Sequence, residues 1–542
     1  MGVPLSARIC AAIGLSMLLV ASAAPAQAPA APSAQSRCAA LKGTGPAGTV
    51  VTEATLVPAG PMPTVAPARP DGPLLPEHCK VRGEIGRRIG VGGRAFAIGF
   101  ELRLPSQWNG RFLFQGGAGL DGVIIPAIGT VTGSAQGPAL ARGFAVASTD
   151  AGHSGSPLDA TFGLDQQARV DYAYDAIGKL TPAAKALVER FYRRPADHSY
   201  FAGCSNGGRQ ALTAAERFPL YFDGIVAGDP TLRFSRVAID EVWNLGVLGR
   251  IAPKDAAGRP IISQAFSPTD LSLVKAALLK RCDARDGLVD GQIQDWRGCD
   301  FDPAQVQCRP GQKEGCLSPD QVGALRDLHR GPRTARGERI YEMFNYDTGI
   351  AGSAWRGMRL GSSQTGVANA ADATLGLGMF RYFQLTPADP QFDPWKPLNL
   401  DDLMRRVRAS SAIGDADNPF LSTFALHGKL IAYNGLSDQG LSSSELVDWY
   451  QQAVADSGPG AADAMRLYLV PGMTHCGGGE ATDQFEMLDA MVAWVEQGRA
   501  PDSIVARTSS GPPLSRPLCP FPTIARFKGG DPSLAQSFEC RA

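Results

Sequence analysis

The chain has 542 residues, of which 44% are hydrophobic and 19% charged, so it can bury a large core and is not disordered throughout. Lysine plus arginine and aspartate plus glutamate both number 52, so the formal net charge is zero. No basic excess favours nucleic acid or an anionic membrane surface as a partner.

The N-terminus has the features of an export signal. A basic residue precedes the apolar run Ile9 to Val20, and small residues that offer several cleavage sites follow it. We predict a signal peptide over residues 1–28, an Ala/Pro-rich linker over 29–37, and a secreted or periplasmic mature protein; a buried N-terminal helix is the alternative. The apolar run is too short to span a bilayer and no later segment is apolar enough, so no membrane span is expected.

The cysteine count favours disulfides. Of eleven cysteines, Cys10 falls in the predicted signal peptide, and the even number that remains is typical of an exported, disulfide-bonded chain. No C-x-x-C spacing indicates a zinc or redox site. The sequence alone does not fix the pairing, although short separations suggest local bridges: Cys282 to Cys299, Cys308 to Cys316, and Cys519 to Cys540.

The elements expected in chain order begin with strands and then alternate. Apolar runs predict strands over 95–104, 112–115, 144–148, 199–202, 222–227, 429–433 and 466–470. Thr181, followed by Pro182, predicts the start of a helix. A second helix is expected from about Gly208 to before Pro219. A last helix is expected over 483–497, with Phe485, Leu488, Val492 and Val495 on its buried face.

These elements predict an α/β fold built on a parallel sheet. Residues 231–424 differ in character, with four cysteines, many Gly and Pro residues and few periodic apolar runs. We therefore predict a catalytic domain formed by residues 38–230 and 425–542, with residues 231–424 as an inserted domain.

Gly203-Cys204-Ser205-Asn206-Gly207 matches the G-x-S-x-G pattern between a predicted strand and a predicted helix. In that context the serine is a candidate nucleophile on a strained turn, and the glycines avoid collisions with neighbouring backbone. An ordinary Gly-rich turn is the alternative interpretation.

A serine nucleophile needs a histidine base oriented by a carboxylate. In the chain order of an α/β-hydrolase, the acid follows one late core strand and the histidine the next. Asp438 and His475 occupy those places. Among the other histidines, His153 is the one expected nearest to the pocket, and the rest are expected to be polar surface or hydrogen-bonded residues.

The tetrahedral oxyanion needs two backbone N–H donors. We expect Asn206 to supply one and Gly117, in a glycine-rich loop after the strand 112–115, to supply the other; a simple turn is the alternative for that loop. Cys204 precedes the nucleophile and Cys476 follows the base, so a formed triad would carry the two cysteines together. A disulfide between them would hold the catalytic pair in place.

The chain resembles the tannase and feruloyl esterase family from about Cys38 to the C-terminus. The likeness rests on the octapeptide 203–210, Asp438 and the pair 475–476, and on four further segments: 148–153, 380–383, 428–431 and 494–498. The resemblance implies an α/β-hydrolase fold with a large inserted lid domain, and a serine carboxylic ester hydrolase acting on feruloyl, galloyl or terephthaloyl esters of plant-polymer or polyester origin.

The resemblance also implies structural details. The expected disulfides are Cys38–Cys79, Cys204–Cys476, Cys282–Cys299, Cys308–Cys316 and Cys519–Cys540. Structural Ca²⁺, with no organic cofactor, is expected in a loop of the lid. Its expected ligands are the side chains of Asp283, Asp286 and Asp290 and the carbonyls of Leu288 and Gln292. From the residues alone, a solvated acidic turn is the alternative.

The sequence departs from the family pattern before the acid: residues 435–438 lack the aromatic residue that the family often has there, and Asn434 stands where histidine is frequent. The resemblance therefore does not define the acyl or leaving-group pocket. Lid residues that could contact an aromatic ring or a free carboxylate are Trp355, Arg356, Arg359 and Arg381. Two other functions stay open: a serine peptidase on the same fold, and a noncatalytic, calcium-stabilised carbohydrate-binding protein.

Overall fold

The computed structural model describes residues 1–2, 32–62 and 74–542, and the folded unit comprises Ala34–Ala542. Residues 3–28 of the predicted signal peptide lie outside the described residues. Of the predicted linker, residues 34–37 belong to helix α1 (Ala34–Ala39), where the buried Cys38 anchors the helix.

A nine-stranded sheet organises the fold, in the order β1-β4-β5-β7-β6-β8-β9-β10-β11. Its strands are β1 (Thr49–Val57), β4 (His78–Ile89), β5 (Ala95–Pro105), β6 (Arg111–Gln115), β7 (Ala145–Thr149), β8 (His198–Cys204), β9 (Gly224–Gly228), β10 (Lys429–Gly435) and β11 (Met465–Val470). The pairs from β1 to β7 are antiparallel, and those from β7 through β6 to β11 are parallel. All seven predicted strands are present, and β1 and β4 are additional.

Alternate residues of the central strands pack on opposite faces of this sheet. Phe114 and Phe201 belong to one core cluster, while their neighbours Leu113 and Tyr200 belong to another. Both sets are buried, so these strands are apolar on both faces. This double burial explains why they read as continuous apolar runs.

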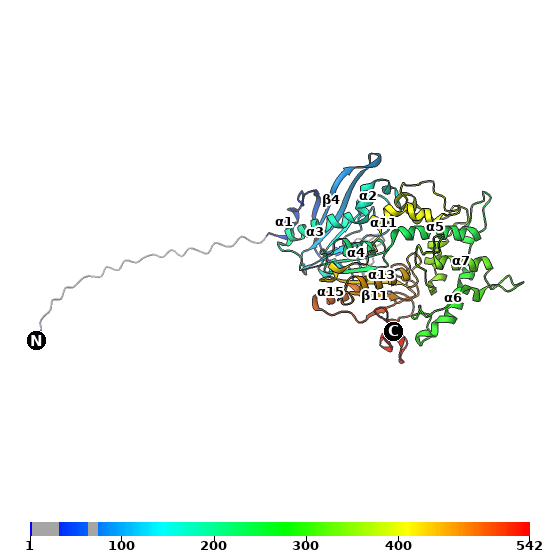
Figure 1. Cartoon of the computed structure of the whole chain (residues 1–542). Helices are drawn as coiled ribbons and strands as arrows, with labels where there is room; N and C mark the ends of the chain where they lie inside the picture. The colour runs from blue at the N-terminus through cyan, green and yellow to red at the C-terminus, as the bar shows by residue number, and fades with distance from the viewer. Residues whose placement is uncertain (3–31, 63–73) are drawn as a thin grey trace. The chain divides into compact units, whose positions relative to one another are not determined.

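Helices cover both faces of the sheet (Figure 1). On one face lie α3 (Ala176–Tyr192), α4 (Asn206–Arg217) and α13 (Ser443–Asp456), and on the other lies α15 (Met487–Gln497). The prediction for the last helix was partly wrong. Its buried residues are Met487, Leu488, Met491 and Trp494, whereas Val492 and Val495 are only partly buried, and the buried Phe485 precedes the helix.

The predicted helix start at Thr181 was also wrong. The helical segment begins with α2 (Gln166–Val170), whose N-cap is Asp165, and runs through a π-helical turn at Asp171–Asp175 into α3, so Pro182 lies inside the helix. Proline removes one backbone hydrogen bond there and costs about 3 kcal/mol. Burial of apolar residues before it, including Ile177 and Leu180, offsets that cost.

The segment between β9 and β10 forms a layer of helices around a second apolar core, which also includes earlier residues such as Phe96, Phe162 and Tyr172. It contains α5 (Phe234–Ile251), α6 (Pro268–Cys282), α7 (Pro319–Arg330), α8 (Ser353–Arg359), α9 (Leu377–Met379), α10 (Leu400–Arg406), α11 (Arg408–Gly414) and α12 (Ser422–Ala425). Figure 1 shows α5, α6 and α7 gathered at one side of the sheet. We refer to residues 231–424 as the insertion.

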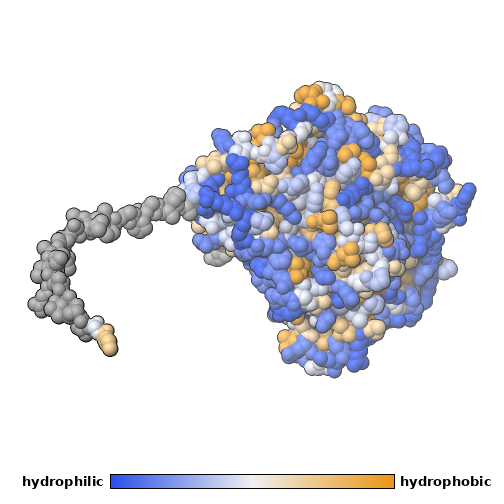
Figure 2. All heavy atoms as spheres, turned by 60° about the vertical axis from the view of Figure 1, so that its left-hand side comes forward, coloured by the Kyte–Doolittle hydropathy of each residue, from blue (hydrophilic) through white to orange (hydrophobic). Residues whose placement is uncertain are grey.

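The C-terminal residues add two small hairpins, β12 (Ile504–Arg507) with β13 (Ser515–Leu518) and β14 (Ile524–Phe527) with β15 (Phe538–Arg541). Five disulfides join the pairs that the family resemblance implied: Cys38–Cys79, Cys204–Cys476, Cys282–Cys299, Cys308–Cys316 and Cys519–Cys540. On the face in Figure 2, hydrophobic residues are scattered among hydrophilic ones. Within the described residues, no helix is both long and apolar enough to cross a membrane.

Candidate active site

Ser205 lies at the sharp turn between β8 and α4, with the backbone angles φ 64° and ψ −126° that few L-residues adopt. The glycines around it are required by space. A Cβ atom at Gly203 would lie 2.5 Å from the Gly207 carbonyl oxygen, and one at Gly207 would lie 2.6 Å from the Gly117 carbonyl oxygen. The turn therefore holds the serine hydroxyl at the end of the sheet.

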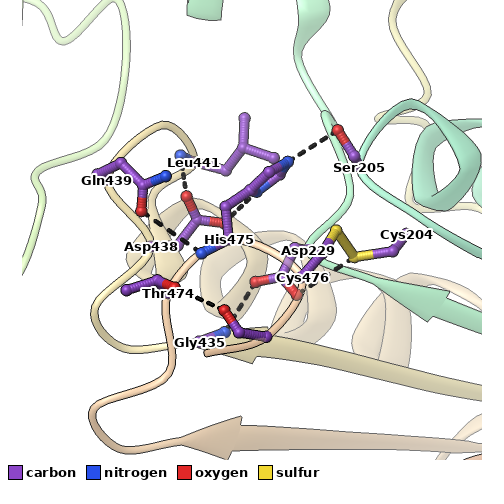
Figure 3. The surroundings of a disulfide bond; sticks show 11 residues. Cys204, Ser205, Asp229, Gly435, Asp438, Gln439, Leu441, Thr474, His475 and Cys476 are labelled. Carbon is purple, nitrogen blue, oxygen red and sulfur yellow. Dashed lines mark hydrogen bonds and ion pairs between the residues drawn. A yellow bond between two sulfur atoms is a disulfide. The ribbon is translucent and has the colours of Figure 1, made fainter. Parts of the chain in front are cut away.

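His475 connects Ser205 to Asp438 (Figure 3). Its Nε2 lies 2.8 Å from Ser205 Oγ, and its Nδ1 lies 2.7 Å from Asp438 Oδ2. Asp438 follows β10 and His475 follows β11, two adjacent parallel strands whose carboxyl ends meet at one edge of the sheet. The three predicted catalytic side chains are thus brought together in hydrogen-bonding order.

The Asp438 carboxylate is fixed by its own turn. The amides of Gly440 and Leu441 donate to Oδ1 over 2.8 and 2.9 Å, which leaves Oδ2 for His475. Burial opposes ionisation, but the His475 charge and hydrogen bond, together with the two amides, lower the pKa of Asp438. Asp438 is therefore an anion aimed at the imidazole.

A second buried acid, Asp229, lies beside this pair and was not identified from the sequence. It follows β9 with φ 35°, is fully buried, and accepts a hydrogen bond from the Gly435 amide over 2.9 Å. One of its carboxyl oxygens lies within 4.8 Å of a carboxyl oxygen of Asp438 and of a ring nitrogen of His475, and its Oδ2 lies 3.5 Å from Cys204 Sγ. Burial and the charge of Asp438 raise the pKa of Asp229 well above its usual value.

The pKa of His475 sets the expected pH dependence. Burial lowers it, but Asp438, and to a smaller extent Asp229, raise it to about 9. Only neutral His475 can accept the serine proton, so kcat/KM for a neutral ester should rise with pH, through an apparent pKa above the 6.5 of free histidine. A pH–rate profile checks this, and a limb at or below 6.5 would contradict it.

Asp229→Asn is the matched variant for this profile. Asparagine keeps the shape of the side chain but cannot carry a charge, so the limb should move to lower pH, because Asp229 contributes to the raised pKa of His475. An unchanged profile would show that Asp229 carries no charge while His475 titrates.

The glycine-rich loop behind the nucleophile is only partly as predicted. The Gly117 amide donates to Gln210 Oε1 over 2.8 Å, and Gln210 Nε2 in turn donates to Asp121. Asn206 begins α4, where the first amides of the helix have no intrahelical acceptor. The Asn206 amide is thus in the expected place, while the Gly117 amide already has an acceptor.

A cavity of about 260 Å³ opens onto Ser205 and His475. Its walls are mostly apolar and include residues that the described insertion contributes: Phe234, Val237, Met358, Leu375 and Met379. It is large enough for an aromatic ring with a short side chain, and it places that ligand against the serine hydroxyl.

The four lid residues predicted to contact substrate do not line this cavity. Arg359 is buried and pairs with Asp372 over 3.0 Å, because a buried guanidinium needs a carboxylate partner. Arg356 donates to the Ser263 and Phe266 carbonyls, and Arg381 to the Phe392 carbonyl. Trp355 lines a smaller neighbouring cavity.

His153 is likewise absent from the walls of this cavity. It is buried and stacks on Phe162 at 3.8 Å between ring centroids. Burial lowers its pKa to about 4, so it is a neutral core histidine.

The predicted calcium loop follows α6. Asp283 and Asp286 are buried, and no cationic side chain forms an ion pair with either within the described residues, whereas Asp290 pairs with Arg516 over 2.5 Å. Burial, together with the charges of Asp290 and Asp283, raises the pKa of Asp286 to about 7. The acidic oxygens of the loop do not form a cluster of three within 4.8 Å of one another. Two buried, uncompensated carboxylates fit a hard cation such as Ca²⁺.

Two functional positions were missed at the sequence level. Asp229 follows a predicted core strand. Asp438 and His475 were predicted from the same position after a strand, so this position could also have identified Asp229. Glu241, an acidic residue in the wall of the cavity, gave no signal, because α5 was not predicted and so its inward face was unknown.

Comparisons with known proteins show to which family the chain is similar. The family model described as tannase and feruloyl esterase matches residues 79–541. A mono(2-hydroxyethyl) terephthalate hydrolase from Piscinibacter sakaiensis is 39% identical, over 90% of this chain and 89% of that protein. A probable feruloyl esterase from Arthroderma benhamiae is 30% identical, over 81% of each chain.

The crystal structure of feruloyl esterase B from Aspergillus oryzae superposes with a TM-score of 0.78 at 24% identity, covering 94% of this chain and all of that one. This likeness confirms the predicted α/β-hydrolase fold. The match to the family model identifies the family. The chain belongs to the tannase and feruloyl esterase family of carboxylic ester hydrolases.

Proposed function

We propose that the protein hydrolyses carboxylic esters of aromatic acids through a Ser205–His475–Asp438 triad and an acyl-enzyme. The observation that carries this proposal is the pair of hydrogen bonds at His475, 2.8 Å to Ser205 and 2.7 Å to Asp438. Feruloyl, galloyl and terephthaloyl esters are the substrate classes suggested by the relatives named above, and an apolar cavity at the serine suits their rings.

The proposed reaction has two steps. Ser205 Oγ attacks the ester carbonyl while its proton passes to His475 Nε2; His475 then protonates the departing alkoxide, and an alcohol leaves. Water attacks the acyl-enzyme with the same proton transfers and releases the carboxylic acid. Asp438 holds the imidazole in the tautomer that faces the serine and stabilises the imidazolium.

The oxyanion of each tetrahedral intermediate would be held by backbone amides. One is Asn206, as expected from the sequence. Because the Gly117 amide is bonded to Gln210, we propose that the second donor is the amide of Ala118 or Gly119, one or two residues further along the same loop.

The insertion would act as a lid that also carries structural calcium. The side chains of Asp283, Asp286 and Asp290 and the carbonyls of Leu288 and Gln292 would hold the ion, which would neutralise the buried acids and take no part in the chemistry. Ca²⁺ is expected to raise the thermal unfolding midpoint of chelator-treated protein, and Asp286→Asn to abolish most of that shift. Equal midpoints with Ca²⁺ and with EGTA would contradict the calcium site.

Export to the periplasm or the medium is proposed on the five disulfides, which need an oxidising compartment. A mature N-terminus between residues 24 and 29, found by mass spectrometry, is the expected result. An intact Met1 in the protein recovered from cells would contradict signal cleavage.

The function is tested with a panel of methyl ferulate, methyl gallate, mono(2-hydroxyethyl) terephthalate, p-nitrophenyl acetate and a chromogenic peptide. Turnover of one or more aryl esters, together with labelling of Ser205 by a serine-directed phosphonate, is expected. Turnover of the peptide alone would favour a peptidase. Failure of the phosphonate to label Ser205, with no turnover of any member, would overturn the proposal.

A further inference from the structure

Glu241 is an acidic side chain in the otherwise apolar wall of the catalytic cavity. It extends from α5, and the walls around it include Phe234, Val237, Leu375 and Met379. Only 6% of its surface is exposed, so water does not solvate it freely. Three ionisable side chains line the described cavity: His475, the phenol Tyr172 and Glu241. Glu241 is the only carboxyl group among them.

One oxygen of this carboxyl group lacks a partner. Glu241 Oε2 is buried and has no hydrogen bond within the described part of the chain. Its position is built into the fold, since a Cβ atom at Gly376 would lie 2.7 Å from Oε2, and glycine leaves the space that the carboxyl group fills. A buried polar atom without a partner costs about 1–3 kcal/mol. Because Oε2 has almost no accessible surface, a ligand in the cavity would bond the other oxygen of the carboxyl group, Oε1.

The surrounding charges keep this group neutral. Arg359, the nearest buried cation, lies 3.0 Å from Asp372 and 3.7 Å from Asp240, so two carboxylates already compensate it. Burial, reinforced by the charges of Asp372 and Asp240 and opposed by Arg359, raises the pKa of Glu241 well above its usual value. In its neutral form, which the raised pKa favours, the Glu241 carboxyl group can both donate and accept a hydrogen bond.

The same surroundings make the cavity unfavourable for an anion. Arg356 and Arg381 are engaged by backbone carbonyls elsewhere in the insertion, and no Arg or Lys lines the described cavity. A substrate carboxylate in this cavity would have no lining cation to pair with, in a site where burial makes an unpaired charge costly.

We infer, on the basis of the proposed function, that Glu241 is a specificity residue that hydrogen-bonds a neutral phenolic hydroxyl on the aromatic ring of the substrate, and that the cavity disfavours rings bearing a free carboxylate. The geometry therefore separates two substrate classes that the family relationship leaves together. Hydroxylated aromatic esters are the preferred class, and half-esters of aromatic diacids are the disfavoured class.

The test uses three matched esters: methyl 4-hydroxycinnamate, methyl cinnamate and methyl 4-carboxycinnamate. For the wild type, kcat/KM should be about tenfold higher for the hydroxyl ester than for the unsubstituted one, as one hydrogen bond predicts, and lowest for the carboxylate ester. Glu241→Leu should reduce the hydroxyl-to-unsubstituted ratio to about one. Glu241→Gln, which keeps a donor and an acceptor, should retain most of the ratio.

Glu216→Leu is the matched control. Glu216, near the end of α4, also has a buried oxygen without a partner and a pKa raised by burial, to about 7, but it does not line the cavity. Its replacement should leave the ratio unchanged. A ratio near one in the wild type, or a ratio that survives Glu241→Leu, would overturn the inference while turnover of p-nitrophenyl acetate still supports the proposed function. Loss of all ester turnover in the wild type would instead refute the proposed function.

Discussion

Replacing Ser205 or His475 by alanine is expected to lower kcat for ester hydrolysis by a factor on the order of 10⁵ to 10⁶. Each substitution breaks the 2.8 Å hydrogen bond through which the serine proton is transferred. Because the two groups act as a unit, the double variant should be no slower than either single one. Asp438→Asn should lower kcat by about 10⁴, since the amide favours the wrong imidazole tautomer.

The controls separate chemistry from folding. His427 is exposed and is not part of the triad, so His427→Ala should leave kcat unchanged. Circular dichroism and thermal unfolding should show each triad variant folded. Additive losses in the double variant, or a His475→Ala enzyme within tenfold of the wild type, would show that His475 is not the base for Ser205.

The triad was accessible from the sequence because its geometry depends on chain order. Parallel strands place their carboxyl ends at one edge, so an acid and a histidine that follow two successive core strands must approach each other. The strands themselves were readable because they are buried on both faces and hence continuously apolar. Local signals were enough for Ser205, Asp438 and His475.

The residues that shape the cavity were not accessible in this way. Arg359 looked like a carboxylate receptor in the sequence, but the fold pairs it with Asp240, which is far from it in the chain, and with Asp372. Likewise the side chain of Gln210 takes the Gly117 amide from a position 93 residues away. Such long-range pairings depend on tertiary packing, and no periodicity or motif in the chain predicts them.

Local signals were also misleading where packing outweighed them. Thr181 and Pro182 form a typical helix start, yet the helix begins upstream because the apolar residues before Pro182 are buried against the sheet. A propensity of a few kcal/mol is smaller than the burial of several large side chains.

The second large effect that we expect is the loss of activity when the Cys204–Cys476 disulfide is removed. The bond joins the residue before the nucleophile to the residue after the base, across 272 positions of sequence (Figure 3). Cys476 has φ 60° and is followed by three glycines, and hydrogen bonds of Thr474 with Gly477 and of the Gly478 amide with Asp483 also hold this loop. In the loop-entropy model a closure of this length contributes about 5 kcal/mol.

The double variant Cys204→Ser/Cys476→Ser should therefore lower kcat by about 100-fold, the effect of a displacement of roughly 1 Å in a catalytic group. The assay should be run at a temperature where circular dichroism shows the variant folded. Cys308→Ser/Cys316→Ser is the matched control, because it removes a disulfide of the insertion whose residues do not contact the triad. Its kcat should equal that of the wild type.

The division of the loss between kcat and KM distinguishes positioning from general stabilisation. Eight of the seventeen residues that line the cavity belong to the insertion, which this disulfide does not hold, so KM should change less than kcat. Movement of His475 away from Ser205 affects only the proton transfer and appears in kcat. If the folded variant kept the wild-type kcat and lost only thermal stability, the bond would be a structural crosslink and not a support for the catalytic pair.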